Sequence, residues 1–249
     1  NIPEVSFDLP KIIARKSKVV RKLVLGVKAK LTANNVTIVS GEAQIIDKNT
    51  VRCGEETYEG ENLILCTGSE TFIPPIPGVE NVDYWTHRDA LDNKEVPASL
   101  TIVGGGVIGM EFASFFTSLG VQVTVVEMLD EILGGMDKEL SAMLRAEYAK
   151  KGIKFLLSTK VVGVSKGETG ITMSYENADG AGTVTADKLL MSVGRRPVTK
   201  GFGLENLNLE WTERRCIKVD EHLQSSVPGV YVCGDLNGVS LLAHTAVRE

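Results

Sequence analysis

The chain has 249 residues, of which 43% are hydrophobic and 24% charged, so it can bury the core of one large domain or two small ones. Its 27 Lys and Arg against 32 Asp and Glu give a net charge of −5 without a basic stripe, which argues against nucleic acid as a partner. No apolar run reaches the roughly 18 residues of a membrane span, and the N-terminus shows no signal pattern, so we expect a cytoplasmic protein that binds no membrane. The chain starts at Asn1 rather than Met and stops in a helical pattern at Glu249, so we expect part of a longer protein.

The first third of the sequence predicts one helix followed by short strands. Residues 8–31 place apolar side chains at helical spacing with Lys and Arg between them, which predicts an amphipathic helix starting near Pro10. The strands are expected at residues 36–39, 43–46, 50–53 and 63–66. The Pro-rich stretch 72–78 cannot be a helix interior and predicts a domain boundary.

From residue 99 the sequence alternates strands and helices, beginning with a strand, a glycine turn, a helix and a second strand. A further helix at residues 137–151 is expected to bury Leu140, Met143 and Leu144. The remaining strands are expected at residues 153–157, 161–164, 171–175, 183–193 and 227–235, with a turn at 177–180. This alternation predicts an α/β fold with a small antiparallel excursion.

The glycine turn between the strand and the helix carries the clearest chemical signal. It fits the pattern GxGxxG with the residues Gly104, Gly105, Gly106, Val107, Ile108 and Gly109. The first glycine permits the tight turn, the third leaves room for a pyrophosphate against bare backbone, and the last lets the helix pack on the sheet. The helix N-terminus adds unpaired N–H groups and a partial positive charge. Strand, turn, helix and second strand agree in order, so a dinucleotide site is favoured over another glycine-rich turn.

An acidic residue, Glu127, ends the second strand of this unit. A carboxylate at this place can accept hydrogen bonds from both ribose hydroxyls of an adenosine, and it would repel a 2′-phosphate. The next ten residues contain no Lys or Arg that could neutralise such a phosphate. The sequence therefore predicts NAD rather than NADP as the cofactor.

The four cysteines lie far apart in the sequence and form no CxxC pair and no metal-ligand spacing, so no metal site is expected. Cys66 and Cys233 stand in apolar strands, and we interpret both as small buried packing residues.

A set of short motifs in a fixed order resembles the pyridine nucleotide-disulfide oxidoreductases over essentially the whole chain. The motifs are LILCTGS at 63–69, IPG at 76–78, VGGGVIGME at 103–111, VVE at 125–127, VGRRP at 193–197, VCGD at 232–235 and LAH at 242–244. Each alone would be weak, but together they are specific. Within that family the chain is most similar to the branch that oxidises dihydrolipoamide.

The resemblance implies an α/β chain with a doubly wound Rossmann-type NAD-binding domain at residues 79–197. It also implies an incomplete FAD-binding domain of the same class, built from residues 1–78 and a return segment, 198–249. The family's own N-terminal FAD fingerprint, its CxxxxC redox pair and its C-terminal interface domain with a catalytic His-Glu pair are absent from these residues. We therefore expect the NAD site and part of the FAD site here, and no catalytic residue and no activity of this chain alone.

The resemblance also carries site residues onto this sequence. Toward FAD it implies Ala43, Thr67, Gly68, Ser69, Asp235, Leu241, Leu242, Ala243 and His244, with Asp235 on the ribityl chain. Toward NAD it implies Gly104 to Gly109, Glu111, Glu127, Val161 and Gly194. The family counterpart of Glu111 pairs with a lysine beside the flavin, and that lysine is absent from these residues.

By the same resemblance the whole protein is a homodimer that reoxidises dihydrolipoamide through a disulfide and FAD and passes a hydride to NAD. Its partner would be the lipoyl domain of a 2-oxo acid dehydrogenase or glycine cleavage complex. Two alternatives stay open at this point. One is a related NADH-dependent flavin oxidase, peroxidase or ferredoxin-type reductase, and the other is a nucleotide-binding module without redox chemistry. An upstream redox cysteine pair would distinguish the dihydrolipoamide-oxidising function from both alternatives.

Overall fold

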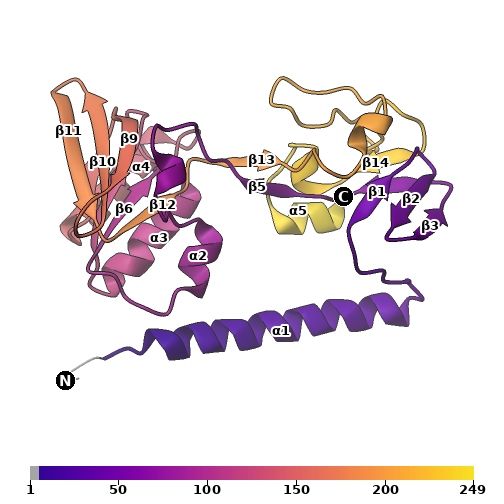
Figure 1. The fold of residues 1–249 in the computed structure, drawn as a ribbon, viewed down its shortest axis with the longest axis horizontal. Helices are drawn as coiled ribbons and strands as arrows, with labels where there is room; N and C mark the ends of the chain where they lie inside the picture. Colours follow the sequence, from indigo (N-terminus) through magenta and orange to yellow (C-terminus); the bar gives the residue numbers. More distant parts are fainter. Residues whose placement is uncertain (1–5) are drawn as a thin grey trace. The chain divides into compact units, whose positions relative to one another are not determined.

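The computed structural model describes residues 6–249 (Figure 1). The chain divides into two compact units. The first comprises the described residues up to Val24 together with Thr71–Gly194, and the second comprises Leu25–Glu70 and Arg195–Glu249. The elements follow one another in a mixed order of helices and strands, so the expected α/β class is confirmed.

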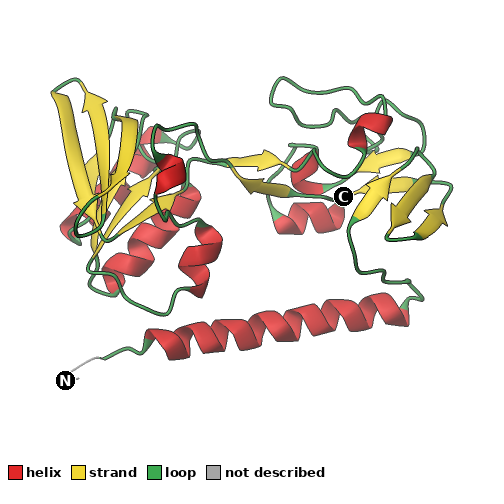
Figure 2. Cartoon of the chain, in the orientation of Figure 1, coloured by secondary structure: helices red, strands yellow, loops and turns green. Residues whose placement is uncertain are grey.

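The first unit is built on a four-stranded parallel sheet with the strand order β12-β6-β7-β8. Its strands are β12 (Lys188–Met191), β6 (Ser99–Val103), β7 (Gln122–Val126) and β8 (Lys154–Leu156). Figure 2 draws the strands of the chain in yellow and its helices in red. The central strands are nearly continuous apolar runs, as a sheet covered on both faces requires, and Leu100 and Ile102 are fully buried. The residues at 101–103, 123–126 and 189–191 therefore lie on neighbouring strands of one sheet.

Two helices pack their apolar faces into the core of this unit. The helix α3 (Val107–Ser118) contributes the fully buried Phe116, whose ring lies edge-on to Phe115 with centroids 5.2 Å apart. The helix α4 (Lys138–Lys150) begins after Asp137, whose side chain accepts two backbone N–H groups and caps the helix.

The face that α4 turns inward differs from the predicted one. Leu140 and Met143 are 64% and 61% exposed, so the expectation that both are buried is wrong. The inward positions are instead Ser141, Leu144 and Tyr148, which are spaced three and four residues apart and therefore share one face of the helix. Only Leu144 was assigned to the core correctly.

An antiparallel three-stranded sheet also belongs to the first unit. It consists of β9 (Lys160–Lys166), β10 (Ile171–Asn177) and β11 (Gly180–Ala186), with the predicted turn between β10 and β11. The single strand expected at residues 183–193 is wrong, because β11 and β12 belong to different sheets.

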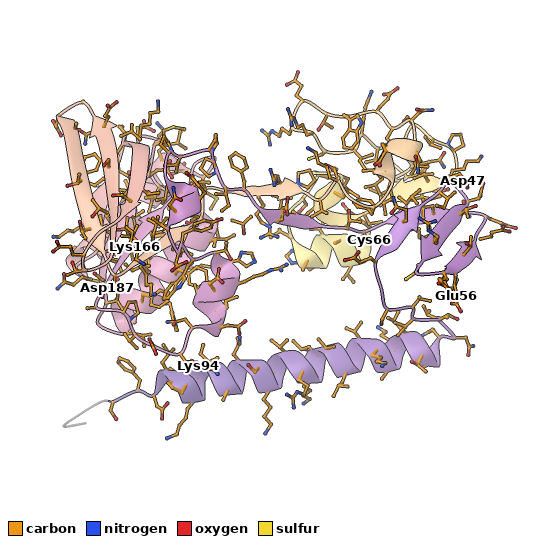
Figure 3. The ribbon with its side chains drawn as sticks, viewed as in Figure 1. Asp47, Glu56, Cys66, Lys94, Lys166 and Asp187 are labelled. Carbon is orange, nitrogen blue, oxygen red and sulfur yellow. The ribbon has the colours of Figure 1, made fainter. Side chains whose placement is uncertain are left out.

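The break between β11 and β12 falls at Asp187, which is labelled in Figure 3. Its carboxylate accepts the N–H groups of Ala98 and Ser99 at 2.8 and 3.1 Å, and its own N–H donates to the Ser99 hydroxyl at 3.0 Å. These bonds tie the switch point to the start of β6. Shorter elements complete the unit: η1 (Val79–Asn81) and α2 (His87–Asp92).

The predicted N-terminal helix is present as α1 (Leu9–Ala33). Leu9 and Ile13 are buried, and the Lys16 ammonium donates to the Leu91 carbonyl at 3.0 Å and pairs with Asp92. No helix among the described residues is long and apolar enough to cross a membrane.

The second unit contains a small antiparallel sheet and a parallel strand pair. The antiparallel strands are β1 (Ala43–Ile45), β2 (Thr50–Cys53) and β3 (Glu56–Glu59), and the parallel pair is β4 (Leu63–Leu65) with β14 (Val230–Val232). Two further strands, β5 (Ser69–Thr71) and β13 (Arg195–Pro197), pair with each other. The remaining elements are η2 (Leu204–Asn206), η3 (Gly234–Leu236) and α5 (Ala243–Arg248). The strand expected at 36–39 is absent, and β3 was not predicted.

The core of the second unit gathers Ile45, Leu65, Leu204, Ile217 and Leu236, all buried. The parallel pair uses one face for this core and leaves the other less covered, because Ile64 is 61% exposed while Leu65 is buried. Cys66 is exposed and Cys233 is half-buried, so the interpretation of both as buried packing residues is wrong for Cys66.

Candidate nucleotide-binding sites

The glycine turn at the end of β6 has a backbone that excludes other residues at its first position. Gly104 adopts a φ of 105°, in the region that favours glycine, and its N–H donates to the Val126 carbonyl at 2.9 Å. A Cβ atom at Gly104 would lie 2.4 Å from the Ser192 carbonyl oxygen. The tight turn therefore needs glycine for both its conformation and its packing.

The next glycines divide between packing and open space. A Cβ atom at Gly109 would lie 2.1 Å from the Gly104 carbonyl oxygen, so this residue lets α3 lie against the turn. A Cβ atom at Gly106 would meet nothing within 4 Å. No side chain caps the N-terminus of α3 at Gly106, so the first-turn backbone N–H groups stand next to that open space. This arrangement suits an anionic group held by backbone amides.

Glu127, directly after β7, lies against the same turn. Its carboxylate accepts the N–H of Gly105 at 2.6 Å and the N–H of Leu129 at 2.8 Å. Its backbone N–H donates to the Leu156 carbonyl at 2.8 Å, which fixes the residue at the end of the sheet. The structure thus brings together the turn and the acid that the sequence singled out.

Two cations that sequence reasoning missed also reach the segment after Glu127, because α4 folds back toward it. Arg145 donates to both carboxylate oxygens of Glu131 at 2.8 and 2.9 Å, and Lys138 pairs with Asp130 at 2.6 Å. Both lie further along the chain than the ten residues that follow Glu127. Both are engaged with carboxylates of that segment.

The Arg145–Glu131 pair also holds the segment in place, because one Glu131 oxygen accepts the Ile132 N–H at 2.9 Å. The bidentate hydrogen bonds from Arg145 hold the pKa of the Glu131 carboxyl below its usual value near 4.5. A carboxyl whose pKa is lowered by folding stabilises the protein above its unfolded pKa, and this contribution is lost as the pH falls through the folded pKa.

We therefore expect Glu131→Gln to lower the free energy of unfolding by about 1–2 kcal/mol at pH 7, a figure reduced for solvent screening of the partly exposed Arg145. The difference from the wild type should shrink as the pH is lowered from 5 toward 3, which urea unfolding followed by circular dichroism would measure. Glu147→Gln removes an exposed carboxylate on α4, the helix that carries Arg145, and serves as the control. A pH-independent difference would contradict the assignment.

Three further predicted residues of the NAD side lie in the first unit. Glu111 is exposed on α3, and Val161 is half-buried in β9, packed against the apolar cluster that contains Val126. Gly194 has a φ of 126°, and its carbonyl accepts the Phe72 N–H at 3.0 Å. Their roles toward a nucleotide stay predictions.

In the second unit a polar network joins three residues that are far apart in the sequence. The Ser69 hydroxyl donates to the Asp235 carboxylate, and the Arg195 guanidinium donates to the Ser69 hydroxyl at 2.7 Å and to its carbonyl at 2.6 Å. Asp235 and Arg195 are 3.9 Å apart and each about a quarter exposed. Arg195 was part of a motif in the sequence, but no role was predicted for it. The network presents a carboxylate and a hydroxyl to solvent, which are groups that can bind a polyol.

The other predicted FAD-side residues lie outside this network. The Thr67 hydroxyl donates to the Val198 carbonyl at 2.9 Å, and Gly68 has a φ of 68°. The stretch before and at the start of α5 is exposed, and it contains Leu241, Leu242, Ala243 and His244. Ala43 lines a cavity of about 520 Å³ together with Gly41, Arg52, Cys53, Tyr58 and Gly201. Among residues 6–249, no group of three His, Cys, Asp or Glu side chains could hold a metal ion.

Comparison with known proteins gives a consistent assignment. A family model described as pyridine nucleotide-disulphide oxidoreductase matches residues 2–249. Among curated proteins, the dihydrolipoyl dehydrogenase of Acholeplasma laidlawii is 42% identical over 99% of this chain and 72% of its own length. That of Geobacillus stearothermophilus is 37% identical, with 98% and 53% covered, and the mitochondrial human protein is 38% identical, with 99% and 50% covered. The chain thus spans about half the length of most curated relatives it matches.

A solved structure gives the same picture for the fold. The HOCl-induced flavoprotein disulfide reductase RclA of Escherichia coli superposes with a TM-score of 0.90 at 28% identity. The match covers 97% of this chain and 55% of that protein.

Proposed function

The chain belongs to the pyridine nucleotide-disulphide oxidoreductase family, and from that premise we propose that it carries the NAD-binding site and part of the FAD site of a dihydrolipoamide-oxidising flavoprotein. In that proposal the whole protein passes electrons from dihydrolipoamide through a disulfide and FAD to NAD. The observation that carries the nucleotide assignment is the uncapped start of α3, where Gly106 leaves open space beside bare backbone and Glu127 lies against the turn.

The residues of the first unit fit a dinucleotide held by backbone. The first-turn N–H groups of α3 would bind the pyrophosphate, and the Glu127 carboxylate would exchange its amide partners for the adenosine ribose hydroxyls. The nicotinamide supplies the hydride-accepting ring, and this chain contributes the placement of the nucleotide. Lys138 and Arg145 are paired with Asp130 and Glu131, which supports NAD over NADP because neither is free to bind a 2′-phosphate.

The residues of the second unit fit a flavin nucleotide. The Asp235 carboxylate, held by Ser69, is placed to accept a hydrogen bond from a ribityl hydroxyl, and the cavity at Ala43 suits the adenine end. A disulfide reductase acting on another substrate is a second candidate, which the superposition on the RclA protein favours. We rank this candidate below the dihydrolipoamide-oxidising function because of the motifs at 103–111, 193–197 and 242–244.

The proposal is tested on the chain and on the whole protein together. We expect the 249 residues alone to show no flavin absorption near 450 nm, because their one GxGxxG turn is at 104–109 and no second such turn is present to bind the FAD pyrophosphate. We also expect no oxidation of dihydrolipoamide, because they contain no CxxxxC cysteine pair. The whole protein should be yellow and should reduce NAD with dihydrolipoamide.

Asp235→Ala in the whole protein should lower its FAD content, with Asp220→Ala, an exposed acid of the same unit, as the control. A whole protein that reduces other disulfides with NADH but leaves dihydrolipoamide unchanged would favour the second candidate. Stoichiometric FAD and dihydrolipoamide oxidation by the 249 residues alone would refute the division of roles.

A further inference from the structure

Two cysteines that play no part in the proposed nucleotide sites end neighbouring strands of the second unit. Cys66 directly follows β4, and Cys233 directly follows β14. These strands are parallel, with Val232 opposite Leu65, and the Cys233 N–H donates to the Leu65 carbonyl at 3.1 Å. The ladder therefore continues by one residue and sets Cys66 opposite Cys233.

Both side chains leave the strand pair on the same face. Leu65 and Val232 turn into the core, so the next residue on each strand points to the opposite face. The backbone of Cys233 is still extended, with φ −119° and ψ 151°. Cys66, which is labelled in Figure 3, is exposed on this face, and Cys233 is half-buried.

Cys66 and Cys233 are both free thiols, and Cys233 lies close enough to affect the pKa of Cys66. Partial desolvation raises the pKa of the Cys66 thiol, and the neighbouring Cys233 thiol raises it further. Cys53 and Cys216, the other free cysteines, do not lie on these strands.

We propose that Cys66 and Cys233 are a redox-sensitive thiol pair that closes to a cross-strand disulfide by exchange with a small-molecule disulfide. Opposed residues on neighbouring strands have Cα atoms about 4.8 Å apart, which lies inside the range that a disulfide can bridge. The strands must draw the two Cβ atoms together at their ends, so the bond is strained and easily reduced.

The exchange runs in two displacements. The exposed Cys66 thiolate attacks the small disulfide, forming a mixed disulfide at Cys66 and releasing one thiolate, which takes up a proton. The Cys233 thiolate then attacks Cys66 Sγ, breaks the mixed disulfide and releases the second small thiol. Two protein thiols are oxidised and one small disulfide is reduced. The raised pKa of Cys66 makes the first step slow at neutral pH and faster as the pH rises.

The pair is distinct from the redox cysteines of the family, which stand five positions apart in one segment. Its position gives it a local effect, because Thr67, Gly68 and Ser69 follow Cys66, and Gly234 and Asp235 follow Cys233. Closing the disulfide would fix the ends of both loops that carry the Ser69–Asp235 contact.

The test equilibrates the 249-residue chain in glutathione disulfide and reduced glutathione at a series of ratios, traps free thiols by alkylation, and maps the peptides by mass spectrometry. We expect an intramolecular link between the Cys66 and Cys233 peptides, with loss of two hydrogen atoms, that a dithiol reverses. Cys66→Ser and Cys233→Ser should each abolish it, and Cys53→Ser should leave it unchanged.

Three results would overturn the proposal. One is four free thiols at every ratio, and another is a link that involves Cys53 or Cys216 or a second molecule. The third is a glutathione adduct that stays on Cys66 in the wild-type chain, because it would show that Cys233 cannot complete the exchange. Labelling of the wild-type protein alone distinguishes these results, so the test does not depend on the folding of the variants.

Discussion

Gly106→Val should leave the chain folded and weaken NADH binding at least about tenfold, which corresponds to about 1.4 kcal/mol. Gly106 has φ −72° and ψ −178°, a conformation that valine adopts, and a Cβ atom there meets nothing within 4 Å. The loss of stability should therefore stay within about 1 kcal/mol, the cost of an unfavourable N-cap residue. The valine methyl groups would fill the space through which a pyrophosphate reaches the backbone N–H groups of α3.

The neighbouring glycine gives the opposite pattern. Gly109→Val forces a Cβ atom to within 2.1 Å of the Gly104 carbonyl oxygen, so it should destabilise the first unit by about 3 kcal/mol or more. Thermal unfolding and isothermal titration with NADH separate the two effects. Gly26→Ala, a substitution in α1 where a Cβ atom also meets nothing within 4 Å, should change NADH affinity little. If Gly106→Val is folded and binds NADH as tightly as the wild type, the proposal that the pyrophosphate binds at the start of α3 is wrong.

The glycine turn could be predicted from sequence because its determinants are local. Strand, turn, helix and second strand follow one another within about thirty residues, the usual span of a βαβ unit, and each position has its own steric reason. The structure adds the clashes that make Gly104 and Gly109 obligatory and the bond from Gly105 to Glu127. The strand predicted before the turn is likewise present as β6.

The errors arise where distant residues decide the outcome. The apolar residues of α4 lie on two overlapping faces, and packing on the sheet selects the one with Ser141 and Leu144. The run at 183–193 is interrupted by the charged residues Asp187 and Lys188, and the prediction of one strand passed over them. The contacts of Asp187 with Ser99 show that the chain changes sheets there.

Distant residues also explain which parts of the candidate sites could not be predicted from the sequence. The network of Ser69, Arg195 and Asp235 joins three segments that no spacing rule connects. Lys138 and Arg145 return to the segment after Glu127 only because α4 folds back. Cys66 stands in an apolar run that is typical of a buried strand, yet the face of β4 to which it belongs is exposed.

The preference for NADH over NADPH should depend on Glu127. Its carboxylate is held by two backbone N–H groups at the turn, where the adenosine ribose would lie, and the nearest cations that we identify are paired with other carboxylates. A 2′-phosphate would have to approach this carboxylate while Lys138 and Arg145 stay engaged with Asp130 and Glu131, which costs on the order of a few kcal/mol. NADH should therefore bind at least about tenfold more tightly than NADPH.

Glu127→Gln should weaken NADH binding and reduce the preference for NADH over NADPH, because the amide removes the negative charge and one hydrogen-bond acceptor. Glu168→Gln, which removes an exposed carboxylate from the loop between β9 and β10, should leave both affinities unchanged. Circular dichroism would establish that both variants keep the fold. The variant and its control thus separate a local role of Glu127 from an effect of net charge.

Isothermal titration of the wild-type chain with NADH and with NADPH under identical conditions is the decisive experiment for the NAD site. We expect saturable binding of one NADH per chain, at least about tenfold tighter than NADPH, and a smaller ratio for Glu127→Gln. Equal affinities for the two nucleotides, or a ratio that Glu127→Gln leaves unchanged, would contradict the assignment of Glu127 and with it the NAD site at the start of α3.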